Sequence, residues 1–185
     1  APPPQEHLPR WRRAVEGLRH SMVRDAEVIA HHYDVSNRFY ELVLGPSMAY
    51  TCALYETPDA TLEQAQSAKF DLVCRKLGLR PGMRLLDVGC GWGSLSLHAA
   101  EHFGAQVTGV TISAEQKRFI DARIAERGLQ DRVEIRLQDY REVPERDHFD
   151  AVGSLEMGEH VGATNYPTYV EALRRAVKPG GRVLV

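Results

Sequence analysis

Residues 83–93 read MRLLDVGCGWG, and this stretch decides how the rest of the chain is interpreted. Residues 84–88 are mostly apolar, as expected of a strand that is buried in a parallel sheet. Gly89, Gly91 and Gly93 follow at once, and a helical pattern begins directly after them. Glycines at a strand-to-helix turn let the backbone pass close to a nucleotide-like ligand. The stretch therefore predicts a ligand-binding turn at the carboxyl end of a strand.

The spacing of these glycines favours one class of ligand. The pattern is GxGxG with Asp87 just before the first glycine, whereas dinucleotide sites show GxGxxG. A strand, an acid and this spacing together are typical of the first motif of class I S-adenosylmethionine (SAM) methyltransferases. We therefore expect SAM first, a nicotinamide dinucleotide second and a purely structural turn third.

Length, charge and cysteine content narrow the class of protein. The 185 residues suffice for about one domain with a real core, and the net charge of -2 gives no general attraction for nucleic acid. The three cysteines contain no CxxC pair, which favours a reducing compartment. No apolar run reaches the length of a membrane span. These features predict a soluble, cytoplasmic protein without a nucleic-acid partner.

From residue 81 onward the pattern alternates between strands and helices. The expected strands lie at about 84–88, 106–111, 132–137, 149–154 and 182–185, and the expected helices at about 93–103, 114–127 and 165–177. This alternation predicts an α/β fold of the class I SAM-methyltransferase (Rossmann-like) type, with a mainly parallel sheet and helices on both faces. Such sheets normally continue beyond the fifth strand, so we expect the core to be incomplete at its C-terminus.

The N-terminal part is expected to be helical. We assign residues 1–7 to a disordered tail, 8–80 to a helical segment that covers the active site, and 81–185 to the SAM-binding core. Residues 8–29 form an apolar stripe that contains Trp11 and is surrounded by arginines. This helix either lies on an anionic membrane or packs on its own domain, and the sequence leaves both open. The arginines are Arg10, Arg12, Arg13, Arg19 and Arg24.

Polar residues at the carboxyl ends of the strands are candidates for the site. The second strand ends without an acid, so Thr111 and Gln116 are expected to bind the ribose instead. After the third strand, Asp139 is expected to accept a hydrogen bond from the adenine amino group, although it could simply cap a turn. After the fourth strand, Glu156 and Glu159 lie where a substrate would meet the SAM methyl group. A carboxylate there can hold a base or a small anion through a shared proton.

We expect no metal site. The histidines of the helical pair His98 and His102 are four residues apart, but no third ligand is apparent, so the pair is expected to lie on a solvated helix face.

Four blocks, taken together and in order, carry a family resemblance. They read HYDVSNRFYELVLGPSMAYTCALYE, LLDVGCGWG, VTGVTISAEQ and SLEMGEHVG. From about residue 31 to the end, the chain resembles the cyclopropane-fatty-acyl-phospholipid synthase family, to which the mycolic acid cyclopropane synthases also belong. In that family the absence of an acid after the second strand is normal.

The resemblance implies an activity. The SAM methyl group is transferred to the cis double bond of an unsaturated phospholipid acyl chain, bound bicarbonate removes a proton from the resulting carbocation, and a cyclopropane closes. It implies catalytic roles for Cys52, the Leu155 backbone and Glu159. With the residues of the glycine motif, the expected cofactor-binding set is Tyr50, Thr51, Asp87, Gly89, Gly91, Thr111, Ile112, Gln116, Asp139 and Tyr140.

Three alternatives stay open at this point. Some relatives form a methylene or methyl branch, as in 10-methyl fatty acids, and the second acid Glu156 makes this branch worth testing. The chain could also be a SAM-binding module without catalysis, or a small-molecule N-methyltransferase. The expected partners are unsaturated phospholipid acyl chains and the anionic inner face of a membrane, in peripheral contact; a homodimer is left open.

Overall fold

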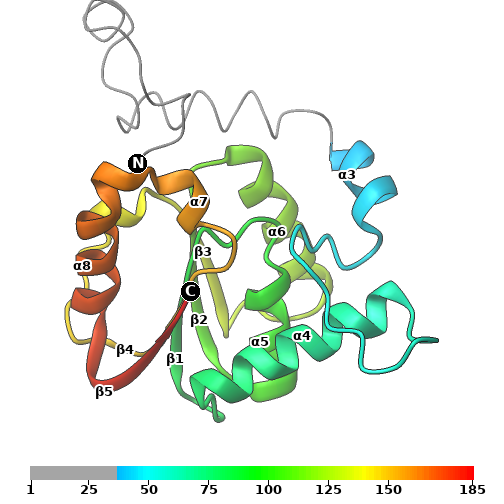
Figure 1. Ribbon diagram of the computed structural model, residues 1–185, viewed down its shortest axis with the longest axis horizontal. Helices are drawn as coiled ribbons and strands as arrows, with labels where there is room; N and C mark the ends of the chain where they lie inside the picture. The colour runs from blue at the N-terminus through cyan, green and yellow to red at the C-terminus, as the bar shows by residue number, and fades with distance from the viewer. Residues whose placement is uncertain (1–36) are drawn as a thin grey trace, which may run out of the picture.

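Five parallel strands form one sheet in the order β3-β2-β1-β4-β5 (Figure 1). The structure is a computed structural model that describes residues 37–185. The strands are β1 (Arg84–Val88), β2 (Gln106–Thr111), β3 (Val133–Leu137), β4 (Phe149–Gly153) and β5 (Val177–Leu184). The predicted parallel α/β sheet is confirmed, and β1 to β4 begin and end within one residue of the expected bounds.

The fifth strand begins earlier than expected, at Val177 instead of residue 182. The run Pro179-Gly180-Gly181 predicts a turn that leads into the last strand. Instead the pairing with β4 shifts register, from Phe149 opposite Val177 to Ala151 opposite Arg182. An irregular stretch of this kind accommodates a proline, because a bulged residue does not need to donate to the ladder.

Helices cover both faces of the sheet, and each face has its own core. On one face lie α4 (Leu62–Leu77), α5 (Ser94–Phe103) and α6 (Ala114–Glu126), and on the other lies α8 (Tyr166–Ala176) (Figure 1). Strand β1 shows why: Leu85 packs toward the first three helices, whereas Leu86 and Val88 pack toward α8. Alternate side chains of a strand point to opposite faces, so a strand buried on both sides is apolar throughout.

Side-chain caps mark where α4 and α6 begin. Thr61 with Gln64, and Ser113 with Gln116, have the sequence spacing that predicts a capping box. The first box forms at the start of α4: Gln64 Oε1 accepts from the Thr61 N–H at 2.8 Å, and Thr61 Oγ1 accepts from the Gln64 N–H at 3.3 Å. The second expected box, at the start of α6, forms only by half. Ser113 Oγ accepts from the Gln116 N–H, but the Gln116 side chain accepts from Thr111 instead. The side chain of Gln116 therefore takes no part in the cap and contacts Thr111 at the end of β2.

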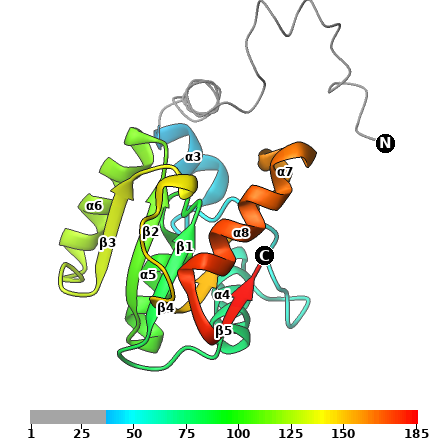
Figure 2. The same cartoon turned by 90° about the vertical axis from the view of Figure 1, so that its left-hand side faces the viewer.

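The short helix α3 (Asn37–Leu44) lies at the end of the sheet to which the strands point (Figure 1, Figure 2). Trp92 of the glycine-rich motif fixes it there, because its Nε1 donates to Asn37 Oδ1 at 3.1 Å and its ring packs on Tyr40. The aromatic-rich residues 31–45 predict a helix, and the part of it before Asn37 lies outside the described residues. So do the tail 1–7 and the amphipathic helix expected at 8–29.

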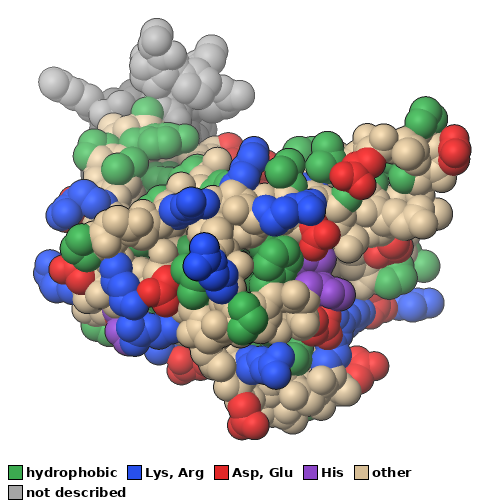
Figure 3. Space-filling view, turned by 90° about the horizontal axis from the view of Figure 1, so that it is seen from below, with side chains coloured by type: hydrophobic (Ala, Val, Ile, Leu, Met, Phe, Trp, Pro, Cys, Tyr) green, Lys and Arg blue, Asp and Glu red, His purple; other side chains and the backbone are tan. Residues whose placement is uncertain are grey.

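The surface offers few further indications. Basic and acidic side chains are interspersed on the face shown in Figure 3. Among the described residues, no helix is both long and apolar enough to cross a membrane. All three cysteines are free thiols: Cys52 is exposed, whereas Cys74 and Cys90 are buried.

Candidate active site

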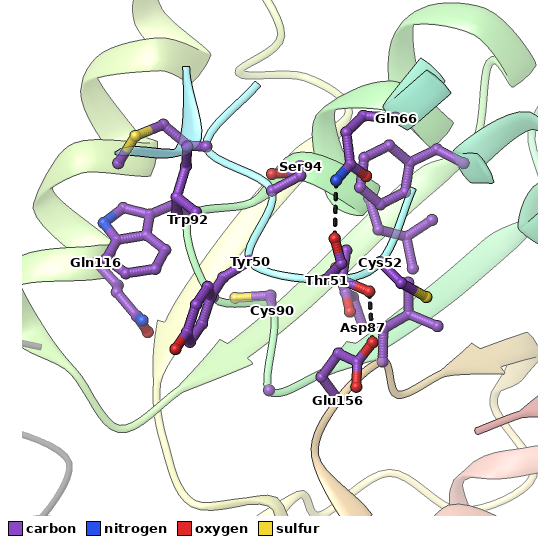
Figure 4. A pocket seen from close by; sticks show the side chains of 18 of the residues that line it. Tyr50, Thr51, Cys52, Gln66, Asp87, Cys90, Trp92, Ser94, Gln116 and Glu156 are labelled. Carbon is purple, nitrogen blue, oxygen red and sulfur yellow. Dashed lines mark hydrogen bonds between the residues drawn. The ribbon is translucent and has the colours of Figure 1, made fainter. Parts of the chain in front are cut away.

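A cavity of about 720 Å³ opens at the carboxyl ends of β1 and β4. Here the chain leaves neighbouring strands in opposite directions, which is where open α/β sheets bind ligands. The loop after β1, the loop after β4, the segment 43–52 and α4 all contribute to its wall (Figure 4). The volume lies within the range of roughly 300–1,000 Å³ that small-molecule sites occupy.

The structure brings together most of the residues expected from the sequence. All three expected catalytic residues line this cavity, although they come from two segments that are distant in the chain. Six of the expected cofactor-binding residues line it as well, whereas four lie outside its wall. The lining residues are Cys52, Leu155, Glu159, Tyr50, Thr51, Asp87, Gly89, Gly91 and Gln116; those outside are Thr111, Ile112, Asp139 and Tyr140.

Asp87 is the buried acid of the site. Its side chain is 2% exposed, and one carboxylate oxygen accepts from Ser96 Oγ at 2.7 Å. Burial raises the pKa of Asp87 to about 6, and the hydrogen bonds from Ser96 only partly oppose this effect. A positive charge on a bound ligand would favour the ionised form of this buried carboxyl group and form an ion pair with it.

Gln116 connects the end of β2 to the cavity. Its buried side chain lines the cavity, and its Oε1 accepts from Thr111 Oγ1 at 2.8 Å. Thr111 does not line the cavity itself. Its hydrogen bond orients the side chain of Gln116, which does.

Asp139 and Tyr140, which follow β3, have structural roles in the fold. Asp139 caps the short helix η2 (Tyr140–Glu142), accepting from the Arg141 N–H at 2.9 Å and from Arg141 Nη2 at 2.6 Å. Tyr140 is buried in the core under α8, edge-on to Tyr169. The turn-capping interpretation of Asp139 is thus realised, and its contact with adenine stays a prediction.

A polar network joins the two loops that carry the expected catalytic residues. Thr51 Oγ1 donates to Glu156 Oε1 at 2.6 Å (Figure 4). The same hydroxyl oxygen accepts from Lys69 Nζ. Gln66 Nε2 of α4 donates to the Thr51 carbonyl oxygen at 2.8 Å. The hydrogen bond from Thr51 and the charge of Lys69 lower the pKa of Glu156, against the opposing effect of its burial. Partial burial lowers the pKa of Lys69, and nearby Cys52 and Glu156 counteract this.

Sequence reasoning missed several residues of this site. Trp92, Gln66 and Phe70 line the cavity, and Lys69 supports it from α4. One feature of the sequence could have indicated this part of the site: Lys69 is a lysine on the otherwise apolar face of its helix. Trp92 lies inside the glycine motif, but its contact with α3 follows from tertiary packing.

The two histidines are not the solvated pair that the sequence predicted. His98 is only 9% exposed and its Nε2 lies 2.8 Å from Asp71 Oδ1, while His102 stacks against it and remains exposed. Burial lowers the pKa of His98, and Asp71 opposes that shift. Within residues 37–185, no group of three or more His, Cys, Asp or Glu side chains could hold a metal ion.

Comparisons with known proteins identify the family of this chain. The chain is 53% identical to a probable fatty acid methyltransferase of Mycobacterium tuberculosis, covering 100% of this chain and 43% of the relative. It is 46% identical to the cyclopropane-fatty-acyl-phospholipid synthase of Escherichia coli, covering 83% and 38%. The chain thus spans less than half the length of both curated relatives.

A solved structure shows the same fold. The mycolic acid cyclopropane synthase CmaA1, complexed with S-adenosylhomocysteine (SAH) and CTAB, superposes with a TM-score of 0.79 at 35% identity, covering 85% of this chain and 54% of that one. The family described as mycolic acid cyclopropane synthetase matches residues 20–185. The chain therefore belongs to the cyclopropane synthase family and has the fold of a class I SAM methyltransferase.

Proposed function

We propose that this chain supplies the SAM site and part of the catalytic site of a lipid-modifying enzyme. The enzyme transfers a one-carbon unit to the cis double bond of an unsaturated fatty acyl chain of a phospholipid, and the product is a cyclopropane. One observation carries the proposal. A single cavity is lined by Gly89 and Gly91 of the motif after β1 and also by Cys52, Leu155 and Glu159. The descriptions of similar proteins support the proposal: one relative is a probable fatty acid methyltransferase, another is a cyclopropane-fatty-acyl-phospholipid synthase, and a similar solved structure is a mycolic acid cyclopropane synthase.

The residues of the cavity suit SAM. Gly91 has no side chain to obstruct the ligand, and the buried Asp87 carboxyl is suited to pair with the ammonium group of a bound amino acid. Gln116 offers amide hydrogen bonds toward the ribose. SAM, when bound, supplies an electrophilic methyl group. The chain's own residues orient it and keep water from the reacting carbon.

The other side of the cavity suits a small oxyanion such as bicarbonate. Cys52, Leu155 and Glu159 all line this cavity, and they can offer a thiol, a backbone N–H and a carboxyl group. Donors on both sides of an oxyanion would hold it where it can accept a proton. We therefore include bicarbonate in the proposal, as the proton acceptor of the reaction.

A second product class has its own support. Two relatives, at 53% and 49% identity, are described as probable fatty acid methyltransferases. Glu156, a second acid, lines the same cavity. A methylene branch that is later reduced to a methyl branch would arise from the same methyl transfer, and we keep it as the alternative.

Mass spectrometry of lipids from cells that express the full-length gene tests the proposal. The expected result is a mass gain of one methylene group per modified acyl chain. Fragmentation distinguishes a ring from a methylene branch of the same mass, and a branch that has been reduced to methyl carries two further hydrogens. Unmodified lipids together with intact SAM binding would contradict it, and would favour a SAM-binding module or a small-molecule N-methyltransferase.

The expected partners follow from this substrate. An acyl chain must leave the bilayer to reach the cavity, so we propose peripheral contact with the inner, anionic face of a membrane. The basic helix expected at residues 8–29 is the candidate contact surface.

A further inference from the structure

Glu156 has an unfavourable backbone conformation. Its φ is +52°, in the left-handed region that glycine adopts readily and other residues rarely adopt. Strained residues of this kind persist where the surrounding structure holds them, often beside a functional site. The reason for a glutamate at this position must therefore lie in the contacts of its side chain.

Those contacts lead to the opposite wall of the cavity. Thr51 Oγ1 donates to Glu156 Oε1 at 2.6 Å across a separation of 105 residues, and Lys69 Nζ donates to the same hydroxyl group. The hydrogen bond from Thr51 lowers the pKa of Glu156 most, and the neighbouring Cys52 N–H and Glu159 side chain add to this effect. We call Lys69, Thr51 and Glu156 the clamp.

The clamp lies between the groups proposed to do the chemistry. Thr51 directly precedes Cys52. Glu156 directly follows Leu155 and lies just before the one-turn helix α7 (Gly158–Val161), which contains Glu159. Lys69 adds a positive charge from the rigid helix α4, and Gln66 of the same helix holds the Thr51 carbonyl. Two loops are therefore tied to each other and to a helix at one point.

We propose that Glu156 is a positioning residue that holds the Cys52 wall of the cavity at a fixed distance from Glu159, through Thr51 and Lys69. This inference rests on the proposed function, and it assigns a role that the cavity residues alone do not imply. A misplacement of about 1 Å at a reacting group costs on the order of a hundredfold in rate, so such a clamp has a measurable effect.

The clamp also bears on the product. In methyl transfer the carbon–sulfur bond breaks with its electron pair left on sulfur, and the π pair of the alkene forms the new carbon–carbon bond. The neighbouring carbon becomes cationic. Loss of a proton from the new methyl group, with its C–H pair closing the ring, gives a cyclopropane. If a hydride first shifts onto the cationic carbon, loss of the same kind of proton gives a methylene branch instead.

A loosened clamp should therefore slow proton removal and leave more time for the hydride shift. The proton acceptor is the oxyanion proposed between Cys52 and Glu159. We expect variants of Glu156 to turn over more slowly and to give a higher ratio of methylene to cyclopropane product.

The test uses Glu156→Gln, which keeps the shape, and Glu156→Gly, which relieves the strained backbone. Asp147→Gly is the matched control, because Asp147 has φ +46° in an exposed loop and does not line the cavity. The full-length enzyme is assayed with SAM, bicarbonate and vesicles of an unsaturated phospholipid. We expect about a tenfold or larger loss of turnover in both Glu156 variants, with a melting temperature for Glu156→Gly no lower than that of the wild type.

A second measurement does not depend on activity. Cys52 is the exposed thiol and the other two cysteines are buried, so the fast phase of labelling with a thiol reagent reports on the Cys52 loop. We expect labelling to accelerate severalfold in both Glu156 variants and in Lys69→Met, and to stay unchanged in Asp147→Gly.

The outcomes separate the clamp from the proposed function. The proposed positioning role of Glu156 would be overturned if both Glu156 variants kept the turnover, the product ratio and the labelling rate of the wild type. If the wild-type enzyme modifies no lipid, the proposed function fails and labelling alone decides: acceleration supports the clamp, and an unchanged rate overturns it.

Discussion

Replacing Gly91 tests the cofactor site most directly. Gly91 has φ +55°, and a Cβ built on it would meet no heavy atom within 4 Å. Because Gly91 lines the cavity, that open space is the space of the ligand. An added side chain would therefore clash with bound SAM and not with the protein.

The cost to stability and the cost to binding can be separated. A left-handed backbone costs a non-glycine residue about 1–2 kcal/mol, which a domain with roughly 5–15 kcal/mol of stability tolerates. The loss of affinity is additional. We expect Gly91→Ala to weaken SAM binding about tenfold, equivalent to roughly 1.4 kcal/mol, and the larger, branched Gly91→Val to abolish measurable binding.

Gly128 provides the matched control. It has φ +65°, a Cβ there would also meet nothing within 4 Å, and it follows α6 outside the cavity wall. Gly128→Ala and Gly128→Val should lower the free energy of unfolding as much as the Gly91 variants do, and leave SAM affinity unchanged. Calorimetric titration with SAM and urea unfolding measure the two quantities. A folded Gly91→Val protein with wild-type SAM affinity would refute the reasoning.

Three further predictions address other parts of the site. Burial raises the pKa of Asp87 from 3.8 to about 6, so the ligand-free fold should lose stability as pH rises through this interval, because the folded state holds the proton that the unfolded state has released. The ammonium group of SAM favours the ionised carboxylate, so SAM affinity should rise between about pH 5 and 7; a similar slope in Asp87→Asn by calorimetry would exclude this pairing. Glu159→Gln should keep SAM affinity within a few-fold and reduce turnover by about a hundredfold or more, and a wild-type rate at every bicarbonate concentration in single-turnover kinetics would show the assignment to be wrong. Anionic vesicles should sediment the full-length protein in a salt-sensitive manner, and retained sedimentation after Arg10, Arg12 and Arg13 are all changed to Gln would reject the helix expected at 8–29 as the contact.

The sequence by itself determined the sheet and the position of the ligand turn. A strand or helix that is buried on one or both faces shows a local periodicity of apolar residues in the sequence. The glycines after β1 mark a turn whose backbone geometry depends on few residues outside it. The strands β1 to β4 and the capping box at Thr61 were predictable for this reason. Family resemblance then identified Cys52 and Glu159, which line one cavity although they lie in different segments.

Only the tertiary structure decided which polar groups meet. The partners Thr51 and Glu156 lie 105 residues apart, and no periodicity links two loops at that separation. The burial of His98 against Asp71 depends on how α4 packs on α5, so a helical pattern around His98 could not reveal it. The early start of β5 depends on an irregular pairing with β4 that overrides the turn preference of Pro179. Side-chain hydrogen bonds between distant segments are set by where the backbone places two loops, and that placement depends on the packing of the whole core.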